Sequence, residues 1–346
     1  MCRHICPIGN ATGHERNTPR ARALSLAMVA REGVPFSQDI IDNLYECALC
    51  GACSNDCTTG WDPVQFTKEA RLAAALEGKI PAHIETLLAN IEEKGNVFGK
   101  DSFCSDLLAK INSLPKEADT LFFLGKDAIY KTPDKAIKAI ELMEKMGEGF
   151  TVLADEPDSG YALDFLFGAA DETKKVMEDT AKALNGYKKI VAYDAADAKV
   201  FLREYKEWGI ALSAEVVTFT SYIAEKIASG AISPKNSGKT YTPQDNALLM
   251  RDVDETDKTR EILSKCGSLC EMLLTKKDTV FAGNLIMNEY MPSVMKLVAE
   301  RRWEDAIRMG ATTLVTTSAA EYYLLNMYKP ENVNILTIEE AVAECL

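Results

Sequence analysis

The sequence of 346 residues lacks several features that mark common classes of protein. No apolar run approaches the roughly 20 residues that a membrane-spanning helix needs, and no secretory signal precedes the first cysteines. Positive charge is scarce, because 39 Lys and Arg face 52 Asp and Glu and leave a formal net charge of −13. A nucleic-acid partner would require a basic stripe. We therefore expect a cytoplasmic protein that binds no nucleic acid and does not span a membrane.

The chain also lacks the short motifs of several catalytic sites. It contains no Gly-rich dinucleotide fingerprint, no phosphate loop and no nucleophile elbow. We therefore expect no flavin or nicotinamide on this chain. We also expect the chain to be a non-catalytic subunit, which does not turn over a substrate alone.

Cysteine, in contrast, is concentrated near the start. Six of the ten cysteines lie within the first 57 residues: Cys2, Cys6, Cys47, Cys50, Cys53 and Cys57. The last four form a C-x2-C-x2-C-x3-C run, and Cys6 is followed by Pro7. In a reducing compartment so dense a motif indicates metal binding rather than disulfides.

The spacing of the cysteine run is typical of a cubane iron–sulfur cluster. A C-x2-C-x2-C loop presents three thiolates to one cluster, and the fourth comes from the Cys-Pro end of the other motif. Cys6, Cys47, Cys50 and Cys53 are therefore predicted to bind the iron of a [4Fe-4S] cluster. Four cysteines can also hold zinc, but zinc sites usually space their cysteines as two separated pairs.

The sequence does not decide whether the chain binds a second cluster. Its expected ligands include Cys2 and Cys57, and the remaining two would lie three and six residues before Cys2, ahead of Met1. Either the assigned start is too late, or the chain is clipped, or the cluster is absent or ligated otherwise. Cys104, His4 or a residue of a partner could complete the set, and the spacing selects none of them.

The rest of the chain predicts a mixed fold, α + α/β. Caps at Thr18, Ser37 and Asp62 indicate three helices around the cysteines, so we expect an all-helical ferredoxin domain over residues 1–95. Beyond it, apolar runs separated by amphipathic helices predict strands at 120–124, 150–154, 189–193, 246–250 and 311–315. Helices are expected around 256–265, 286–308 and 319–327, with a linker at 230–238.

These strands and helices are predicted to form two repeated α/β domains with small parallel sheets, at 96–230 and 231–346. Residues 190–197 align with 314–321 at an offset of 124, and residues 158–160 align with 281–283 at an offset of 123. A nearly constant offset at two separate places favours duplication.

The chain resembles a known family: the iron–sulfur subunits of glycolate oxidase, lactate-utilisation and anaerobic glycerol-3-phosphate dehydrogenase systems, together with the heterodisulfide reductase subunits. The resemblance rests on the Cys6-Pro7 half-motif, the stretch Thr18-Pro-Arg-Ala-Arg-Ala-Leu24, the four-cysteine run, and Gly-Ala-Thr-Thr-Leu-Val-Thr at 310–316. It implies that the partner is an FAD-linked oxidase or dehydrogenase subunit of the 2-hydroxy-acid kind, or an electron-transfer flavoprotein.

The chain departs from that family in its repeats. Each repeat of the family carries a lone cysteine, a Cys-Cys-Gly and a C-x2-C, of which only the glycines remain. The other positions hold Lys126, Asp158, Ser159, Asp194 and Asp197 in the first repeat, and Asp245, Phe281, Ala282, Ser318 and Glu321 in the second. Carboxylates do not hold iron–sulfur clusters. The disulfide-cleaving and quinone-reducing chemistry of the family is therefore not expected here.

The three substituted aspartates of the first repeat have two interpretations. We expect Asp158, Asp194 and Asp197 to be solvated loop residues at the mouths of α/β folds. The alternative is that they surround a hard cation or a basic side chain of a partner.

The sequence thus predicts an iron–sulfur electron-transfer subunit of a multi-subunit FAD-dependent oxidoreductase. Two alternatives stay open: a catalytic subunit of the heterodisulfide-reductase type, and a redox-responsive binding protein whose cluster regulates docking.

Overall fold

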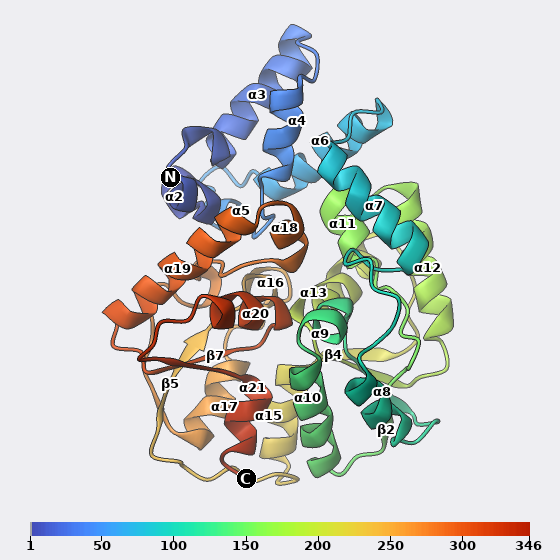
Figure 1. The fold of residues 1–346 in the computed structure, drawn as a ribbon, viewed down its shortest axis with the longest axis vertical. Helices are drawn as coiled ribbons and strands as arrows, with labels where there is room; N and C mark the ends of the chain where they lie inside the picture. The colour runs from blue at the N-terminus through green and yellow to red at the C-terminus, as the bar shows by residue number, and fades with distance from the viewer. Residues whose placement is uncertain (1) are drawn as a thin grey trace.

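A computed structural model describes residues 2–346, which form many helices and two small parallel sheets (Figure 1). The predicted class, α + α/β with small parallel sheets, is confirmed. The N-terminal helices occupy one end of the molecule, and the chain terminates at the opposite end, beyond α21 (Figure 1). None of the helices described for residues 2–346 is long and apolar enough to cross a bilayer.

Residues 2–94 contain helices and no strand. The elements are α1 (Cys2–Ile5), α2 (Pro7–Thr12), the 3-10 turn η1 (Glu15–Asn17), α3 (Pro19–Glu32), α4 (Gln38–Tyr45), α5 (Ala52–Asn55), α6 (Pro63–Leu76) and α7 (Ala82–Lys94). The predicted helix starts are confirmed, because the side chains of Thr18, Ser37 and Asp62 accept backbone N–H groups of α3, α4 and α6. These caps fix where the chain enters and leaves the cysteine loops.

The first sheet has the order β2–β1–β3–β4, with all strands parallel. Its elements are α8 (Ser105–Asn112), β1 (Thr120–Phe123), α9 (Lys126–Lys131), α10 (Pro133–Lys145), β2 (Phe150–Thr151), α11 (Tyr161–Phe167), α12 (Asp171–Ala183), β3 (Lys189–Ala192), α13 (Ala195–Lys199), the π-helical turn η2 (Val200–Glu204), α14 (Tyr205–Glu207), β4 (Glu215–Thr218) and α15 (Phe219–Ala228). In the register of the sheet, Leu121 lies beside Thr151 and Ile190. The strands predicted at 120–124, 150–154 and 189–193 are confirmed, and β4 was not predicted.

The second sheet has the order β6–β5–β7–β8 and is also parallel. Its elements are β5 (Thr240–Gln244), α16 (Ala247–Arg251), α17 (Lys258–Cys266), β6 (Ser268–Leu269), the 3-10 turn η3 (Lys276–Asp278), α18 (Leu285–Tyr290), α19 (Pro292–Arg308), β7 (Thr313–Thr316), α20 (Ala319–Met327), β8 (Asn334–Thr337) and α21 (Ile338–Ala343). The two sheets therefore share one strand order. β3 and β7 begin at residues 189 and 313, which reproduces the offset of 124 seen in the sequence.

The strand predicted at 246–250 is wrong, because these residues form helix α16. The side chain of Asn246 accepts the backbone N–H groups of Leu248 at 2.9 Å and Leu249 at 3.3 Å, which starts a helix. The strand lies just before it, in the polar run Thr240–Gln244, where no apolar pattern marks it. The strand predicted at 311–315 is β7, which begins two residues later and ends one residue later.

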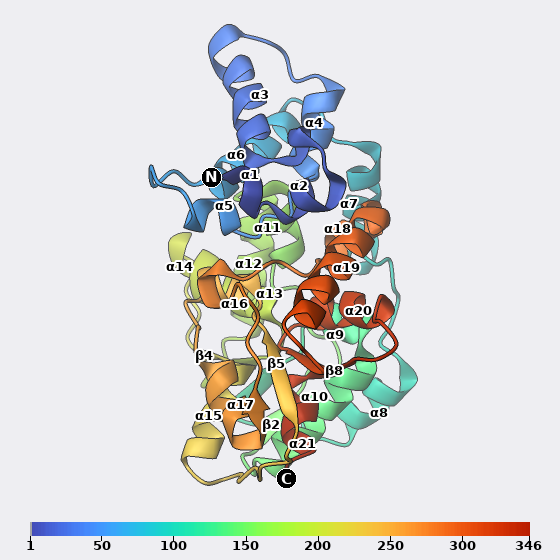
Figure 2. The ribbon, with the colours of Figure 1, turned by 90° about the vertical axis from the view of Figure 1, so that its left-hand side faces the viewer.

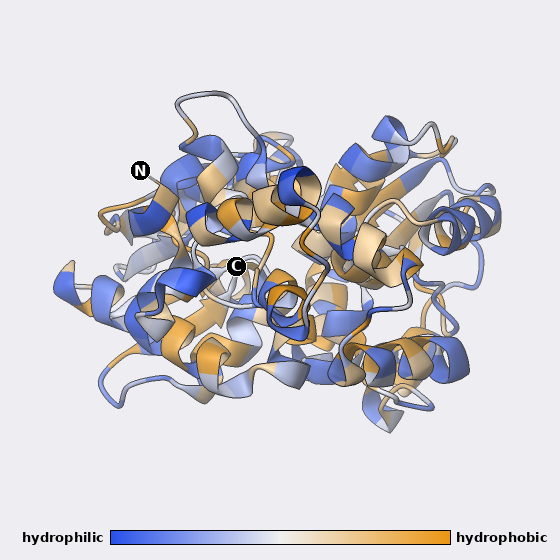
Figure 3. Cartoon of the chain, turned by 90° about the horizontal axis from the view of Figure 1, so that it is seen from above, coloured by the Kyte–Doolittle hydropathy of each residue, from blue (hydrophilic) through white to orange (hydrophobic). Residues whose placement is uncertain are grey.

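Three layers of apolar side chains surround the two sheets. Successive residues of β1 point to opposite faces, as in any strand: Leu121 and Phe123 pack in one core, and Phe122 packs in another. The core that holds Phe122 also holds Val315 of β7, so it lies between the two sheets. Seen from above, hydrophobic segments gather toward the interior and hydrophilic ones toward the outer helices (Figure 3).

The N-terminal helices share a core with the second sheet. Ile8 of α2 and Leu44 of α4 belong to the same buried cluster as Met295 of α19 and Leu314 of β7. α2 contacts α19, and α6 contacts α11, so the helical end rests on both repeats (Figure 2). This packing positions the cysteine loops directly above the α/β part of the chain.

A buried ionic cluster joins α6 to the first repeat. Lys68 Nζ lies 2.6 Å from a carboxylate oxygen of Asp164, and Lys199 Nζ lies 3.0 Å from the other. Glu204 of the π-helical turn accepts from Lys199 at 2.7 Å. All four side chains are at least nine-tenths buried, so each charge depends on its partners to offset desolvation.

Candidate metal centre

Three of the predicted ligands lie on the loop that follows α4 and on the first turn of α5. Cys47 and Cys50 precede α5, and Cys53 lies within it. Leu49 and Gly51 both adopt positive φ, 50° and 74°. A left-handed leucine is uncommon, and such backbone conformations concentrate at functional sites. The sharply turned loop allows three cysteines close in sequence to reach one pocket.

The fourth predicted ligand, Cys6, caps helix α2. Its Sγ accepts the backbone N–H of Gly9 at 3.4 Å and lies 3.2 Å from the carbonyl of Asn17, to which the thiol donates. Pro7 occupies the first position of the helix, where its missing N–H costs nothing. The Cys-Pro pair therefore places a sulfur atom at the start of a helix, and N–H groups that point at sulfur stabilise its negative charge.

The structure brings the four predicted ligands together. Cys6, Cys47, Cys50 and Cys53 line one pocket, together with apolar side chains that include Ile8, Leu49 and Val64. Four soft thiolates in a largely apolar surrounding suit an iron–sulfur cluster. The donor set and its setting thus fit the group that the spacing predicts.

Burial controls the protonation of these thiols. It raises the pKa of Cys50 to about 11, although the nearby charge of Arg251 opposes the rise. Burial also raises the pKa of Cys6, and burial together with the charge of Cys47 raises that of Cys53. Without metal these thiols hold their protons at neutral pH, so binding of iron must release them.

Three arginines hold the backbone of the cysteine loops. Arg22 Nη2 donates to the carbonyl of Asn17 at 2.9 Å, Arg71 Nη2 donates to the carbonyl of Cys47 at 2.8 Å, and Arg251 Nη1 donates to the carbonyl of Cys50 at 2.6 Å. They come from α3, α6 and α16. The sequence did not single out Arg71 or Arg251. The one signal for Arg71 is a charged residue beside Ala70 and Ala74 on the buried face of α6.

Cys2 and Cys57 do not line this pocket. They are partly exposed, at the start of α1 and just after α5, and these two helices contact each other. Hydrogen bonding to Thr59, whose Oγ1 lies 3.2 Å from Cys57 Sγ, lowers the pKa of that thiol. Cys104 precedes α8, at the other end of the molecule from α1 and α5 (Figures 1 and 2). It is therefore not placed to join Cys2 and Cys57.

The substituted positions of the first repeat meet in one pocket. Asp158, Asp194 and Asp197 line it with Lys126 and Asp127, at the carboxyl ends of β1, β2 and β3. Ligands of open parallel sheets commonly bind at this edge. The structure thus brings together residues that the family pattern had placed as equivalents of a cysteine set.

The expectation that these aspartates are solvated is wrong for Asp194 and Asp197, which are 1% and 6% exposed, while Asp158 is half-buried. Asp194 accepts the backbone N–H groups of Ala196 at 2.8 Å and Ala319 at 3.2 Å. Asp197 accepts the hydroxyl of Ser159 at 2.5 Å. Ala319 and Ser159, which are distant in the sequence, help to satisfy these carboxylates, so the chain can bury them.

Sites for a single metal ion are absent from the part of the chain that the structure describes. No three His, Cys, Asp or Glu side chains there form a group that could hold one metal ion. The aspartate pocket therefore has no group of ligands for the hard cation that was the alternative there. The same absence applies to the cysteines, but it does not argue against a cubane, because its thiolates each bind a different iron and stand farther apart than the ligands of one ion.

The equivalent positions of the second repeat are filled by side chains. Arg302 Nε donates to Gln244 Oε1 at 2.6 Å, and Gln244 Nε2 lies 3.3 Å from Glu321 Oε1. Burial raises the pKa of Glu321 to about 8. Asp245 accepts two bonds from Arg260, both at 2.8 Å. At the positions of Asp245 and Glu321, polar partners therefore occupy the place of cysteines, while Phe281 and Ala282 are buried apolar residues.

Comparison with protein families identifies the N-terminal part. Residues 1–61 match the family model of the 4Fe-4S dicluster domain. This stretch contains all six cysteines of the two motifs. The assignment of these motifs to iron–sulfur chemistry is therefore confirmed at the level of the domain.

Most of the chain is similar to subunits of reductases from Methanothermobacter and Methanosarcina. It is 22% identical over 283 residues to a subunit of the fumarate reductase (CoM/CoB) of Methanothermobacter marburgensis, which covers 80% of this chain and 55% of that protein. It is 25% identical over 297 residues to a subunit of the dihydromethanophenazine:CoB–CoM heterodisulfide reductase of Methanosarcina mazei, with 80% and 71% covered. The same subunit from Methanosarcina barkeri is 24% identical over 331 residues, with 89% and 79% covered. The resemblance to heterodisulfide reductase subunits is confirmed, and the chain spans little more than half of the fumarate reductase subunit.

Proposed function

We propose that this chain is an iron–sulfur electron-transfer subunit of a multi-subunit oxidoreductase. The observation that carries the proposal is the pocket in which Cys6, Cys47, Cys50 and Cys53 meet, within a segment that matches a 4Fe-4S dicluster domain. A bound [4Fe-4S] cluster supplies one-electron transfer. The residues of the chain bind it, exclude water from it and set the charge around it.

Each part of the chain has a place in this proposal. Cys6, Cys47, Cys50 and Cys53 bind the first cluster, and Cys2 and Cys57 contribute to a second. Residues 1–95 form the cluster domain. Residues 96–230 and 231–346 form two α/β repeats that serve as a docking scaffold. The continuous core of α2, α19 and β7 supports this role, because it holds the cluster domain firmly on the scaffold.

The partner in this proposal is an FAD-linked oxidase or dehydrogenase subunit, or an electron-transfer flavoprotein. Its support is the family resemblance in the Cys-Pro half-motif and the segments at 18–24 and 310–316. A flavin passes electrons singly or in pairs, so it matches a one-electron carrier.

A second candidate function, catalytic heterodisulfide reduction, is favoured by the similarity to the heterodisulfide reductase subunits of Methanosarcina. The side chains at the repeats argue against it. Asp158, Asp194 and Asp197 stand in the first repeat, and Asp245, Ser318 and Glu321 in the second, where that chemistry would need thiolates. We expect the purified chain not to reduce the CoM–CoB heterodisulfide with a chemical electron donor. Turnover in this assay would favour the catalytic function over electron transfer alone.

The proposal is tested on the anaerobically purified protein by iron and sulfide analysis and by electron paramagnetic resonance after reduction. We expect a [4Fe-4S] signal that Cys47→Ser removes and that Cys104→Ser, an exposed cysteine at the far end, leaves intact. A colourless protein without iron, or one that holds zinc, would contradict the proposal.

The role as a subunit is tested in the native host. Anaerobic purification of the tagged chain should recover a flavoprotein in fixed stoichiometry. A signalling or transcriptional partner in its place would favour the redox-responsive binding protein instead.

A further inference from the structure

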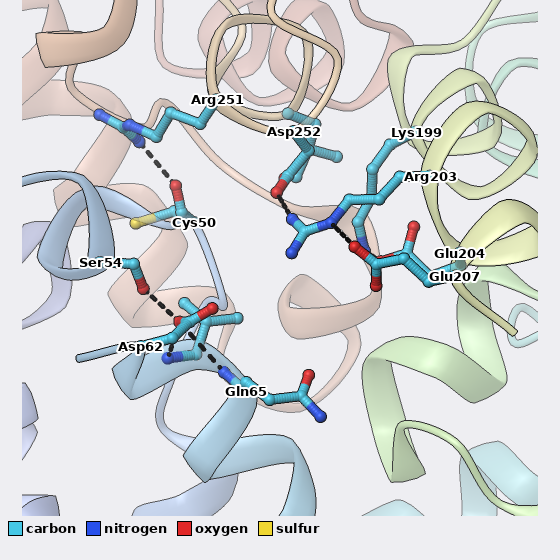
Figure 4. A network of polar contacts seen from close by, with 12 residues as sticks. Cys50, Ser54, Asp62, Gln65, Lys199, Arg203, Glu204, Glu207, Arg251 and Asp252 are labelled. Carbon is cyan, nitrogen blue, oxygen red and sulfur yellow. Dashed lines mark hydrogen bonds and ion pairs between the residues drawn. The ribbon is translucent and has the colours of Figure 1, made fainter. Parts of the chain in front are cut away.

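The cysteine loop is also held by one residue of the second repeat. Arg251 is the last residue of α16, which directly follows β5. Its Nη1 donates to the carbonyl of Cys50 at 2.6 Å, as Figure 4 shows. Residues 201 positions apart in the sequence are thereby joined at the centre of the C-x2-C-x2-C loop.

The rest of the guanidinium is fixed within the second repeat. Nε donates to the carbonyl of Lys277 at 2.8 Å, and Nη2 donates to the carbonyl of Thr279. Three carbonyls from two segments thus fix the plane of the group. A planar guanidinium held in this way has little freedom, so its position relative to Cys50 is set by the fold of the second repeat.

The position of Gly51 is a second, independent observation that the cysteine loop packs against Arg251. A Cβ at Gly51 would lie 3.2 Å from Arg251 Cδ, and the φ of +74° already disfavours any side chain there. The loop therefore comes close to Arg251 at one residue and is hydrogen-bonded to it at the residue before. Asn55 Nδ2 adds a contact to Asp278 Oδ1 at 3.3 Å in the same region.

The surrounding charges distinguish Arg251 from its neighbour Arg203. Both line the pocket beside the loop, with Asp62, Asp252 and Ser54 (Figure 4). Arg203 forms ion pairs with Asp252 and, at 3.0 Å, with Glu207, so carboxylates neutralise it. Arg251 donates to neutral carbonyls, and no carboxylate among residues 2–346 forms an ion pair with it, so its positive charge beside Cys50 is not neutralised by a direct partner.

We propose that Arg251 is a positioning residue for the bound cluster, through which the second repeat orients the Cys50 loop and raises the reduction potential of the cluster. The inference rests on the proposed electron-transfer function. A reduced cluster carries one more negative charge than the oxidised one, so a nearby cation stabilises the reduced form more. A change in the second repeat that moves α16 thereby changes the electron affinity of the cluster.

The test is a redox titration of the anaerobic protein, followed by electron paramagnetic resonance, for Arg251→Gln, Arg251→Lys and the matched control Arg203→Gln. We expect Arg251→Gln to shift the midpoint to more negative potential and to lower the iron retained per chain. Arg251→Lys keeps the charge and should stay close to the wild-type midpoint. Arg203→Gln should not change it.

Two outcomes would overturn the inference: a wild-type midpoint in Arg251→Gln, or an equal shift in Arg251→Lys and Arg251→Gln. If Arg251→Gln binds no iron, a midpoint of Arg251→Lys clearly more negative than that of the wild type overturns the inference. Failure of the underlying function looks different, because the wild-type protein itself would then show no cluster signal.

Discussion

The aspartate pocket makes a specific prediction about Asp127. This side chain is 8% exposed, and no hydrogen bond or ion pair is found for it among residues 2–346. Burial raises its pKa well above 3.8, and the charge of Asp194 raises it further, while Lys131 opposes the rise. Asp158 and Glu289 add to the rise. The substitution Asp127→Asn removes the titrating group and keeps the shape.

The sign of the effect follows from linkage. A carboxyl whose pKa is higher in the folded state than in the unfolded state contributes stability at low pH, and this contribution is lost as the pH rises toward the folded pKa. The wild-type protein should therefore lose stability relative to Asp127→Asn as the pH increases. A difference of one bound proton between the folded and unfolded states changes the free energy of unfolding by about 1.4 kcal/mol for each pH unit. The largest change that one such group can cause between pH 5.5 and 7.5 is therefore about 2.7 kcal/mol.

The observed gain should be smaller than this limit. Burial raises the pKa of Asp194 to about 6, and Asp194 interacts with Asp127, so removing one carboxyl makes the other easier to ionise. We expect the advantage of Asp127→Asn in the free energy of unfolding to grow by roughly 1–2 kcal/mol over this interval.

The measurement is urea unfolding in anaerobic buffer at pH 5.5 and 7.5, followed by circular dichroism. The matched control is Asp155→Asn, which replaces an exposed turn residue of the first repeat and for which we expect no comparable pH dependence. A difference for Asp127→Asn that is flat, or that shrinks as the pH rises, would refute the reasoning.

Two further predictions concern the joint between the helical end and the sheets. Lys68→Met should lower the free energy of unfolding by roughly 3–5 kcal/mol, because it removes one partner from a buried ionic cluster and leaves Asp164 with Lys199 alone; a loss below about 1 kcal/mol in thermal unfolding would contradict this. Removal of iron by oxidation and chelation should speed amide hydrogen exchange in residues 2–61 and leave β1, β3 and β7 protected, because metal binding stabilises the loops that supply the ligands. Equal loss of protection in the sheets would show that the cluster supports the whole fold.

The sequence predicted best what depends on residues close together in the chain. The starts of α3, α4 and α6 follow from Thr18, Ser37 and Asp62, each of which caps an N–H two or three residues ahead. The cysteine set could be proposed for a similar reason, since its spacing is itself local except for Cys6. The strand at 246–250 failed because a short apolar run fits a buried helix as well as a strand.

Features that depend on distant contacts could not be predicted in this way. The sequence suggests that Asp194 is an exposed loop residue. In the structure it accepts a hydrogen bond from the N–H of Ala319, which lies 125 positions later. The same holds for Arg251 and the carbonyl of Cys50. Strand β4 was not predicted, because its apolar run is short. It lies at the edge of the sheet, where Glu215 is exposed and Val216 and Val217 are only half-buried, so a long apolar run is not required there.

The continuous core between the N-terminal helices and the second sheet has a consequence for electron movement. Ile8 and Leu44 pack in one buried cluster with Met295 and Leu314, so a continuous core holds the cysteine pocket on the second sheet. Tunnelling rates fall steeply with distance, and here the distance inside the protein is set by side-chain packing. Only the approach of the redox partner is left to vary, so the rate of transfer should be governed by how closely that partner docks.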